Sequence, residues 1–221
     1  MRRVISLFVF IFIWCVGSYF LPPLFIPSPL EVANSIFIMC KSGLLLKSLL
    51  FSFLRISVAT LFSISISLAV GLLIVNSKKA EKIIKPITDL CRYIPVTAFY
   101  PLLIMWVGIG EPMKVTFLFI ATFLFFLPNC IQAFQDINVR IIETGKTMGM
   151  SKLQIIKFII LPYSAPSLVK SFLTMYAIGW TYIVVAESVN VVNGIGYLIN
   201  IGSARGRTDI NYLLNNSVMF S

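Results

Sequence analysis

The sequence contains no histidine, and its four cysteines form no Cys-x-x-Cys pair. These absences exclude Cys/His metal sites and histidine-based catalysis as the main function. We expect the cysteines to be small apolar packing residues: Cys15, Cys40, Cys91 and Cys130. The phosphate-binding pattern G-x-x-x-x-G-K-[ST] is also absent, so any ATP hydrolysis has to occur on another polypeptide. We therefore expect a chain that is not an enzyme and that holds no metal and no cofactor.

Charged residues are scarce, at 12% of the chain, whereas they make up about 25% of a soluble domain. Hydrophobic residues make up 58% and lie in long continuous segments. Such segments are typical of transmembrane helices, each of which needs ~20 residues to cross ~30 Å of hydrocarbon. The alternation that a barrel strand requires is missing. The composition predicts an all-α, polytopic transmembrane helical bundle.

Five apolar segments are long enough to be spans, approximately residues 4–21, 49–75, 87–107, 113–134 and 166–186. Between the first two lies IPSPLEV (residues 26–32), whose prolines favour an extended backbone. The last piece, residues 210–221, is too short and too polar to span. We expect five to six spans in one domain, residues 1–221, with the last helix truncated or completed by a neighbouring molecule.

The net charge of +10 comes from lysines and arginines that gather between the predicted spans, in residues 76–85 and 135–162. The positive-inside rule then places these segments and the N-terminus, with Arg2 and Arg3, in the cytoplasm. Because membrane topology explains the basic balance, we expect no nucleic-acid partner. Arg55 lies inside the second span, where a charge must either snorkel to the interface or find a partner.

Residues 136–162, which we call the elbow segment, are polar although they lie between two apolar spans. Asp136 is expected to cap a first short helix that ends near Met148. Gly149 can then adopt the left-handed conformation that ends a helix. The pattern predicts that the chain turns sharply at this glycine, on the cytoplasmic side.

A second short helix is predicted after the turn, because Ser151 and Gln154 form a capping-box pattern. Pro162 is expected to end it. Its apolar face is predicted to consist of Leu153, Ile156 and Ile160. A short amphipathic helix of this kind either rests on the lipid surface or docks into a groove of a cytosolic partner. The residues alone leave both interpretations open.

The elbow segment resembles the signature loop of the permease subunits of bacterial ABC importers. That loop has the pattern E-A-A, three residues, G, nine residues, I, one residue, L-P. The matching residues are Glu143, Gly149, Ile159, Leu161 and Pro162. Thr144 and Gly145 replace the two alanines, and glycine lowers helix propensity by about 1 kcal/mol relative to alanine. We therefore expect the first short helix to be loosened.

Other segments, in order and at similar spacing, resemble the nitrate/sulfonate/taurine-type group of these permeases. They are IPSPLEV, SFLRISVAT (residues 52–60), the proline-rich third span, and Glu187 with the following GIG (residues 194–196). The resemblance covers approximately residues 26–196. It implies a multi-pass subunit of the bacterial plasma (inner) membrane.

The resemblance implies a set of partners and a mechanism. A cytosolic ABC-type ATPase binds the elbow segment, a second permease subunit completes the pathway as a homodimer, and an extracytoplasmic binding protein delivers substrate. The implied substrate is a small organic or inorganic anion, such as a sulfonate or nitrate, or a vitamin precursor. The alternatives are an ion-coupled secondary transporter and a non-transporting membrane scaffold. Four residues are candidates for the pathway, or for interfacial and packing roles: Arg92, Trp106, Trp180 and Glu187.

Overall fold

The computed structural model describes residues 2–22, 25–91, 93–189 and 193–204, and these ranges are helical and contain no strand. The chain divides into two compact units. Unit 1 comprises residues 1–52 and 191–221, and unit 2 comprises residues 53–190. The boundary between them falls inside helix α3 (Leu44–Asn76), which contributes its first part to unit 1 and the remainder to unit 2.

Unit 1 contains α1 (Arg2–Phe20), α2 (Pro29–Lys41), the start of α3, and α10 (Ile195–Ala204). The indole Nε1 of Trp14 in α1 donates a hydrogen bond to the Pro27 carbonyl at 3.0 Å, just before α2. Ser28 caps α2 in an extended conformation, and the carboxylate of Glu31 completes a capping box with it. The extended segment is therefore shorter than expected, because Pro29 occupies the first helical turn, where its missing N–H costs nothing.

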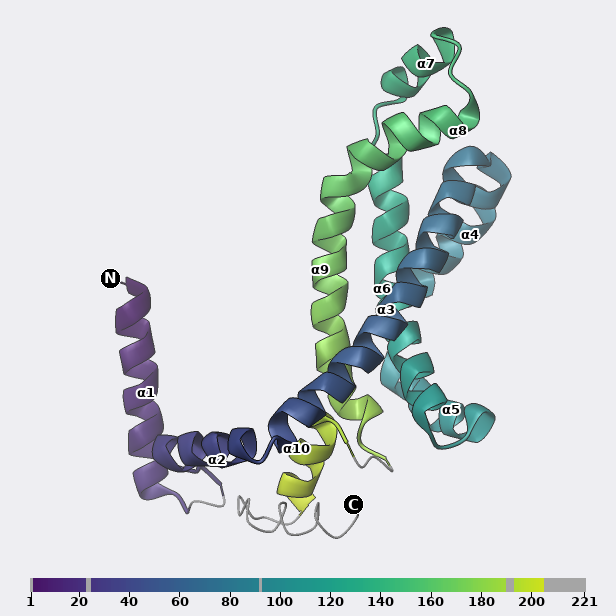
Figure 1. Ribbon diagram of the computed structural model, residues 1–221. Coiled ribbons are helices and arrows are strands. Elements are labelled where there is room, and N and C mark those ends of the chain that lie inside the picture. The colour runs from purple at the N-terminus through teal and green to yellow at the C-terminus, as the bar shows by residue number, and fades with distance from the viewer. Residues whose placement is uncertain (1, 23–24, 92, 190–192, 205–221) are drawn as a thin grey trace. The chain divides into compact units, whose positions relative to one another are not determined.

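Unit 2 is built around α6 (Glu111–Gln135) and α9 (Leu161–Ala186), which lie side by side (Figure 1). The other elements of this unit are α4 (Lys78–Cys91), the 3₁₀ turn η1 (Val96–Ala98), α5 (Phe99–Val107), α7 (Val139–Thr147), α8 (Lys152–Ile155) and the π-helical turn η2 (Ile156–Ile160). Helices α7 and α8 lie at the end of unit 2 where α6 finishes and α9 begins (Figure 1).

Unit 2 has its core between α3, α6 and α9, where apolar side chains face one another. One cluster contains Ile56, Phe117 and Ile183, and another contains Cys130, Phe134 and Met175. Gly179 of α9 allows close contact with α3, since a Cβ at this position would lie 2.9 Å from Cγ2 of Ile56. Small residues at helix contacts are typical of membrane bundles, where association depends on close packing.

Among the described residues, three helices are long and apolar enough to cross a membrane: Leu44–Asn76, Glu111–Gln135 and Lys152–Ala186. A fourth span results if Lys78–Cys91 and Val96–Val107 are counted together, although they meet at 85°. In α1 the apolar helix Phe8–Phe20 is shorter than these spans. The prediction of an all-α transmembrane bundle is confirmed. The number of spans is three to four in this part of the chain, and residues 210–221 lie outside it.

The third predicted span, residues 87–107, differs most from the expectation of a single span. Helix α4 starts well before it, at Lys78 in the basic segment, and ends at Cys91. The next helical turn begins only at Val96, after Pro95. Proline has no N–H to donate to the preceding turn and disfavours a helical conformation of the residue before it, so Pro95 favours a break here, although Pro86 lies inside α4 itself. Two helices therefore form where the composition predicted one.

Candidate functional site

The first helix of the elbow segment, α7, is capped by Asn138, whose side-chain Oδ1 accepts a hydrogen bond from the Arg140 N–H at 3.0 Å. The predicted cap, Asp136, was wrong. Asp136 instead ends α6, and its N–H donates to the Gln132 carbonyl at 2.9 Å. The reason is that α6 continues to Gln135 and that Ile137, only 3% exposed, anchors the turn between the two helices.

The end of α7 confirms the predicted role of Gly149, which has a φ of +77°. The Gly149 N–H donates to the Lys146 carbonyl at 3.0 Å, and the Met150 N–H donates to the Gly145 carbonyl at 3.1 Å. This pair of bonds is a Schellman motif, which satisfies the last carbonyls of a helix through a left-handed residue. The turn between α7 and α8 is therefore fixed by backbone hydrogen bonds.

Gly145 has a packing role that the sequence pattern did not indicate. The residue is buried, and a Cβ at this position would lie 2.7 Å from Cδ1 of Ile159 and 3.3 Å from Sδ of Met150. The absence of a side chain lets α7 rest directly on the helix that follows it. The expected loosening of α7 is not seen, because the helix is regular from Val139 to Thr147.

The second helix of the elbow segment begins with the predicted capping box. The Ser151 N–H donates to Oε1 of Gln154 at 2.7 Å, and the Gln154 N–H donates to Oγ of Ser151 at 3.3 Å. The prediction that this helix ends at Pro162 was wrong. Residues Lys152–Ala186 form one 35-residue helix, in which α8 and η2 lead directly into α9.

The π-helical turn η2 explains how the helix passes Pro162. Its wider turn bonds the Leu161 N–H to the Ile156 carbonyl and places Pro162 in the first turn of α9. A wide turn changes the backbone around the proline ring, which in a regular α-helix would clash with the carbonyl four residues earlier. The Ser164 hydroxyl also donates to the Ile160 carbonyl, which gives that group a partner.

The predicted apolar face of the second helix is only partly correct. Ile160 is buried and Ile156 is half-buried, but Leu153 is 77% exposed and Ile155 is buried in its place. The helix therefore packs inward beneath α7. Five large apolar side chains of the elbow segment are exposed, Ile141 and Phe158 among them, and the three most exposed are Val139, Met148 and Leu153, at 64%, 77% and 77%. We call these three residues the elbow tip. Sequence reasoning had not singled out Val139 or Met148.

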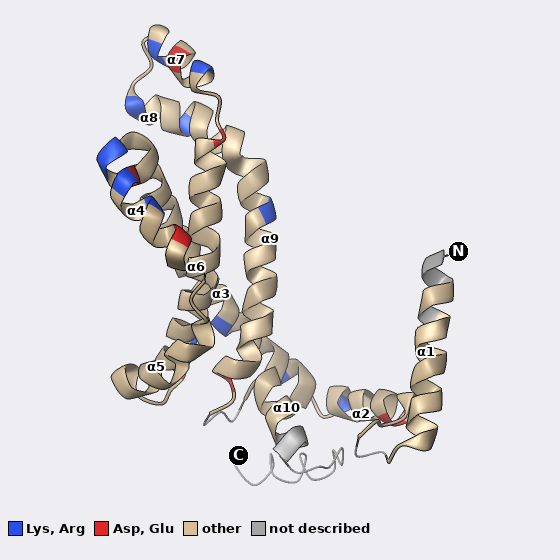
Figure 2. Ribbon diagram, turned by 180° about the vertical axis from the view of Figure 1, so that it is seen from behind, with Lys and Arg blue, Asp and Glu red and all other residues tan. Residues whose placement is uncertain are grey.

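The residues of the importer-like pattern fall into two sets. Ile159 and Leu161 pack against the apolar cluster around Phe134 and Met175, and Gly145 lies against Ile159. Glu143, Thr144 and Pro162 are exposed. The first set fixes the shape of the elbow segment, and the second set forms part of its surface. Figure 2 shows that the lysines and arginines of α4, α7 and α8 lie at this same end of unit 2.

At the other end of unit 2 lies a group of four charged residues, which we call the ion cluster. Arg55 of α3 makes a bidentate pair with Glu111, with Nε–Oε2 and Nη2–Oε1 distances of 2.6 and 2.7 Å. Its Nη1 also donates to Oε1 of Glu187 at 2.7 Å, directly after α9. Lys114 donates to Oε1 of Glu111 at 2.8 Å. Two cations and two carboxylates thus join α3 to the start of α6 and the end of α9.

Arg55 was expected either to snorkel to the membrane interface or to have a charged partner, and the ion cluster shows that it has partners. Its side chain is only 7% exposed and has carboxylate partners, so it does not snorkel. Charges inside a membrane are costly unless they are paired, and this cluster is neutral as a whole. Glu187, a candidate pathway residue, lies fully buried within it. Glu111 and Lys114 were missed, because nothing in the sequence shows that they lie beside a residue more than fifty positions away.

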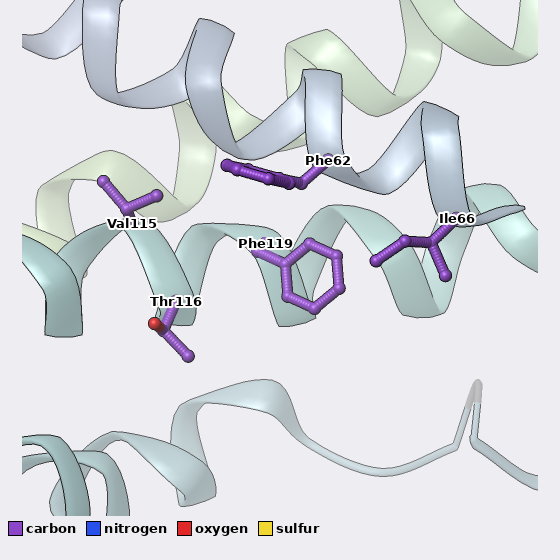
Figure 3. Close-up of a pocket in the computed structure, with 5 residues that line it drawn as sticks. All are labelled: Phe62, Ile66, Val115, Thr116 and Phe119. Atoms are coloured by element: carbon purple, nitrogen blue, oxygen red, sulfur yellow. The ribbon is translucent and has the colours of Figure 1, made fainter.

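Of the other candidate pathway residues, Trp106 and Trp180 lie in different surroundings. Trp106 is 71% exposed near the end of α5, whereas Trp180 is half-buried against the cluster around Phe117. Arg92 lies outside the described residues. An apolar groove of about 230 Å³ lies between α3 and α6, lined by Phe62, Ile66, Val115, Thr116 and Phe119 (Figure 3). A small-molecule site needs several convergent polar groups, and this groove offers only the Thr116 hydroxyl.

No group of three metal-ligating side chains occurs in the described part of the chain. In a comparison with protein families, residues 61–220 match the model described as "Binding-protein-dependent transport system inner membrane component". Among similar proteins is the taurine transport system permease protein TauC of Escherichia coli (strain K12). It is 26% identical over 207 residues, which cover 89% of this chain and 74% of the relative.

A second relative is a putative aliphatic sulfonates transport permease protein, SsuC, of Bacillus subtilis (strain 168). It is 26% identical over 174 residues, which cover 79% of this chain and 63% of the relative. The chain thus spans less than two thirds of this second protein. Among solved structures, inward-facing forms of the MetNI methionine ABC transporter match with TM-scores of 0.62 and 0.64 at 20% identity. The matches cover 80% of this chain and 90% and 88% of those chains.

Proposed function

Because the chain belongs to the family of binding-protein-dependent transport system inner membrane components, we propose that it is the permease subunit of an ATP-driven importer. In this proposal it forms the substrate pathway as a single permease domain, and ATP hydrolysis occurs on a separate cytosolic ABC-type ATPase. The elbow segment transmits the motion of that ATPase to α6 and α9, between which it is inserted in the sequence.

The observation that carries the proposal is the construction of the elbow segment. The Schellman motif and the capping box fix the turn between α7 and α8. Both helices pack on the apolar cluster that contains Phe134. Their tip presents three exposed apolar side chains. Docking into a groove of a partner requires such a rigid helical projection with apolar anchors. A force on the tip is transmitted directly to α9, because α8, η2 and α9 form one continuous helix.

Co-purification tests the proposal. We expect a nucleotide-binding ATPase to remain with the chain in mild detergent and to be identified by its P-loop sequence. The double variant M148D/L153D should lose this ATPase, because both side chains are exposed and would present charge to an apolar groove. The control I109D changes a side chain that is 54% exposed beside the ion cluster and should retain it. Equal retention by both variants would contradict docking at the elbow tip.

The remaining assignments follow from the same family. We propose a second copy of this chain as the other permease subunit and an extracytoplasmic binding protein as the source of substrate. The names of the taurine and sulfonate relatives support a sulfonate or another small anion as the substrate. A vitamin precursor is the second class of substrate. It is supported by the riboflavin transport system permease protein RibX of Chloroflexus aurantiacus, which is 35% identical over 129 residues. The basic residues of α4, α7 and α8 support a cytoplasmic location for the elbow end. We propose the same side for the N-terminus, on the basis of Arg2 and Arg3.

A further inference from the structure

Helix α4 (Lys78–Cys91) has one face that is fixed against the rest of unit 2. Thr88 is buried and Ile84 packs against Ile131 of α6 and its neighbours. The side chain of Gln135 in α6 holds two residues of this face. It accepts a hydrogen bond from Nζ of Lys85 at 2.7 Å and donates one to Oε1 of Glu81 at 2.7 Å. The rotation of α4 about its own axis is therefore defined.

The opposite face of α4 carries a stripe of exposed apolar side chains. Ile83, Ile87 and Leu90 are 66%, 56% and 67% exposed. Their spacing of four and three residues places them on one side of the helix. The stripe extends for ~10 Å, because seven residues separate its ends at ~1.5 Å each.

Three lysines lie at the N-terminal end of this stripe. Lys78, Lys79 and Lys82 are exposed, and within the described part of the chain none of them forms an ion pair. Lys79 precedes Ile83 by four residues and thus continues the stripe directly. The nearest acidic residue in the sequence, Glu81, is held on the other face by Gln135. The other acidic residue of α4, Asp89, is exposed near the far end of the helix, seven residues or ~10 Å beyond Lys82. With four lysines and two carboxylates, α4 keeps a net charge of +2.

We propose that this face of α4 binds an anionic phospholipid. The three ammonium groups contact the phosphate-containing headgroup, and an acyl chain lies along Ile83, Ile87 and Leu90. A cationic group at one end of an apolar stripe matches a ligand with an anionic head and an apolar tail. An acidic protein segment would match the lysines but not the apolar stripe. The proposal requires the chain to lie in a membrane and does not depend on coupling to an ATPase.

Native mass spectrometry of the purified full chain tests this proposal. The chain is titrated with phosphatidylglycerol and, separately, with phosphatidylcholine of the same acyl composition. We expect tighter binding of phosphatidylglycerol, and a loss of that preference by about ten-fold or more in the variant K78Q/K79Q/K82Q, from three surface lysines. The control R140Q/K146Q/K152Q removes three exposed cations of the elbow segment and should leave the preference unchanged.

A second measurement keeps the test independent of the folding of the lysine variant. Wild-type chain is placed in vesicles of phosphatidylcholine with spin-labelled phosphatidylglycerol, and the immobilised lipid fraction is measured at increasing salt. The selectivity should fall with salt, since exposed charges are screened. Equal binding of the two lipids by the wild type would overturn the proposal, as would equal losses in the two triple variants. Protection of the three lysines from acylation by a bound protein, and not by phosphatidylglycerol, would also overturn it.

Discussion

At the scale of single residues, Gly149 has the clearest requirement, because its φ of +77° is unfavourable for side chains other than Asn or Asp. No atom lies within 4 Å of a Cβ built there, so a substitution acts through the backbone alone. We expect G149V to reduce the amount of ATPase that co-purifies to background, whereas G149N retains most of it. Retention of the partner and normal transport by G149V would show that the turn is not needed for coupling.

The ion cluster gives a second prediction at this scale. Removing the cation in R55M leaves the fully buried Glu187 without one of its partners, which we expect to cost roughly 3–5 kcal/mol. E111Q removes one charge but keeps an acceptor oxygen for Arg55 and Lys114, and Glu111 itself is 57% exposed, so we expect a smaller loss than in R55M. Thermal unfolding in detergent measures both effects.

A double variant provides the control for this pair. R55M/E187M replaces both buried partners by apolar side chains and should recover much of the stability lost in R55M, because no uncompensated carboxylate remains. If R55M is as stable as the wild type, Arg55 does not join the three helices as described.

At the scale of elements, the packing of α7 on the following helix depends on Gly145. We expect G145A to be nearly neutral, since the contact at 2.7 Å is with Cδ1 of Ile159, the mobile end of a side chain, and alanine favours the helix by about 1 kcal/mol. G145L should displace α7 and accelerate tryptic cleavage after Lys146. The double variant G145L/I159A should slow that cleavage again. Equal cleavage rates in all three variants would show that this contact does not hold the elbow segment.

The elements also show what the sequence can predict. The turn at Gly149 and the capping box of Ser151 and Gln154 were predictable, because they depend on residues within four positions of one another. The end of the second helix at Pro162 was not, since the π-helical turn there belongs to a helix that is stabilised by packing along its length. The ion cluster could not be predicted from the sequence either, because its residues are brought together only by the fold.

At the scale of the whole molecule, we expect the elbow tip and the turn that contains Ile109 to lie on opposite sides of the membrane. In a variant whose four cysteines are replaced by serine, M148C should react with a membrane-impermeant maleimide only after the cells are opened. I109C should react in intact cells. Both positions are exposed, so reactivity reports on the side of the membrane. The reverse pattern would contradict the proposed orientation and leave the helical fold unaffected.

The central claim is that a separate ATPase docks on the elbow tip. The most direct measurement is a photo-cross-linking amino acid introduced at Met148, and for comparison at Ile109, in native membranes. We expect Met148 to yield a cross-linked product with a P-loop ATPase and Ile109 to yield none. Cross-linking of Met148 to lipid alone, under conditions in which the ATPase is present, would show that the elbow segment rests on the membrane surface and would contradict the coupling role.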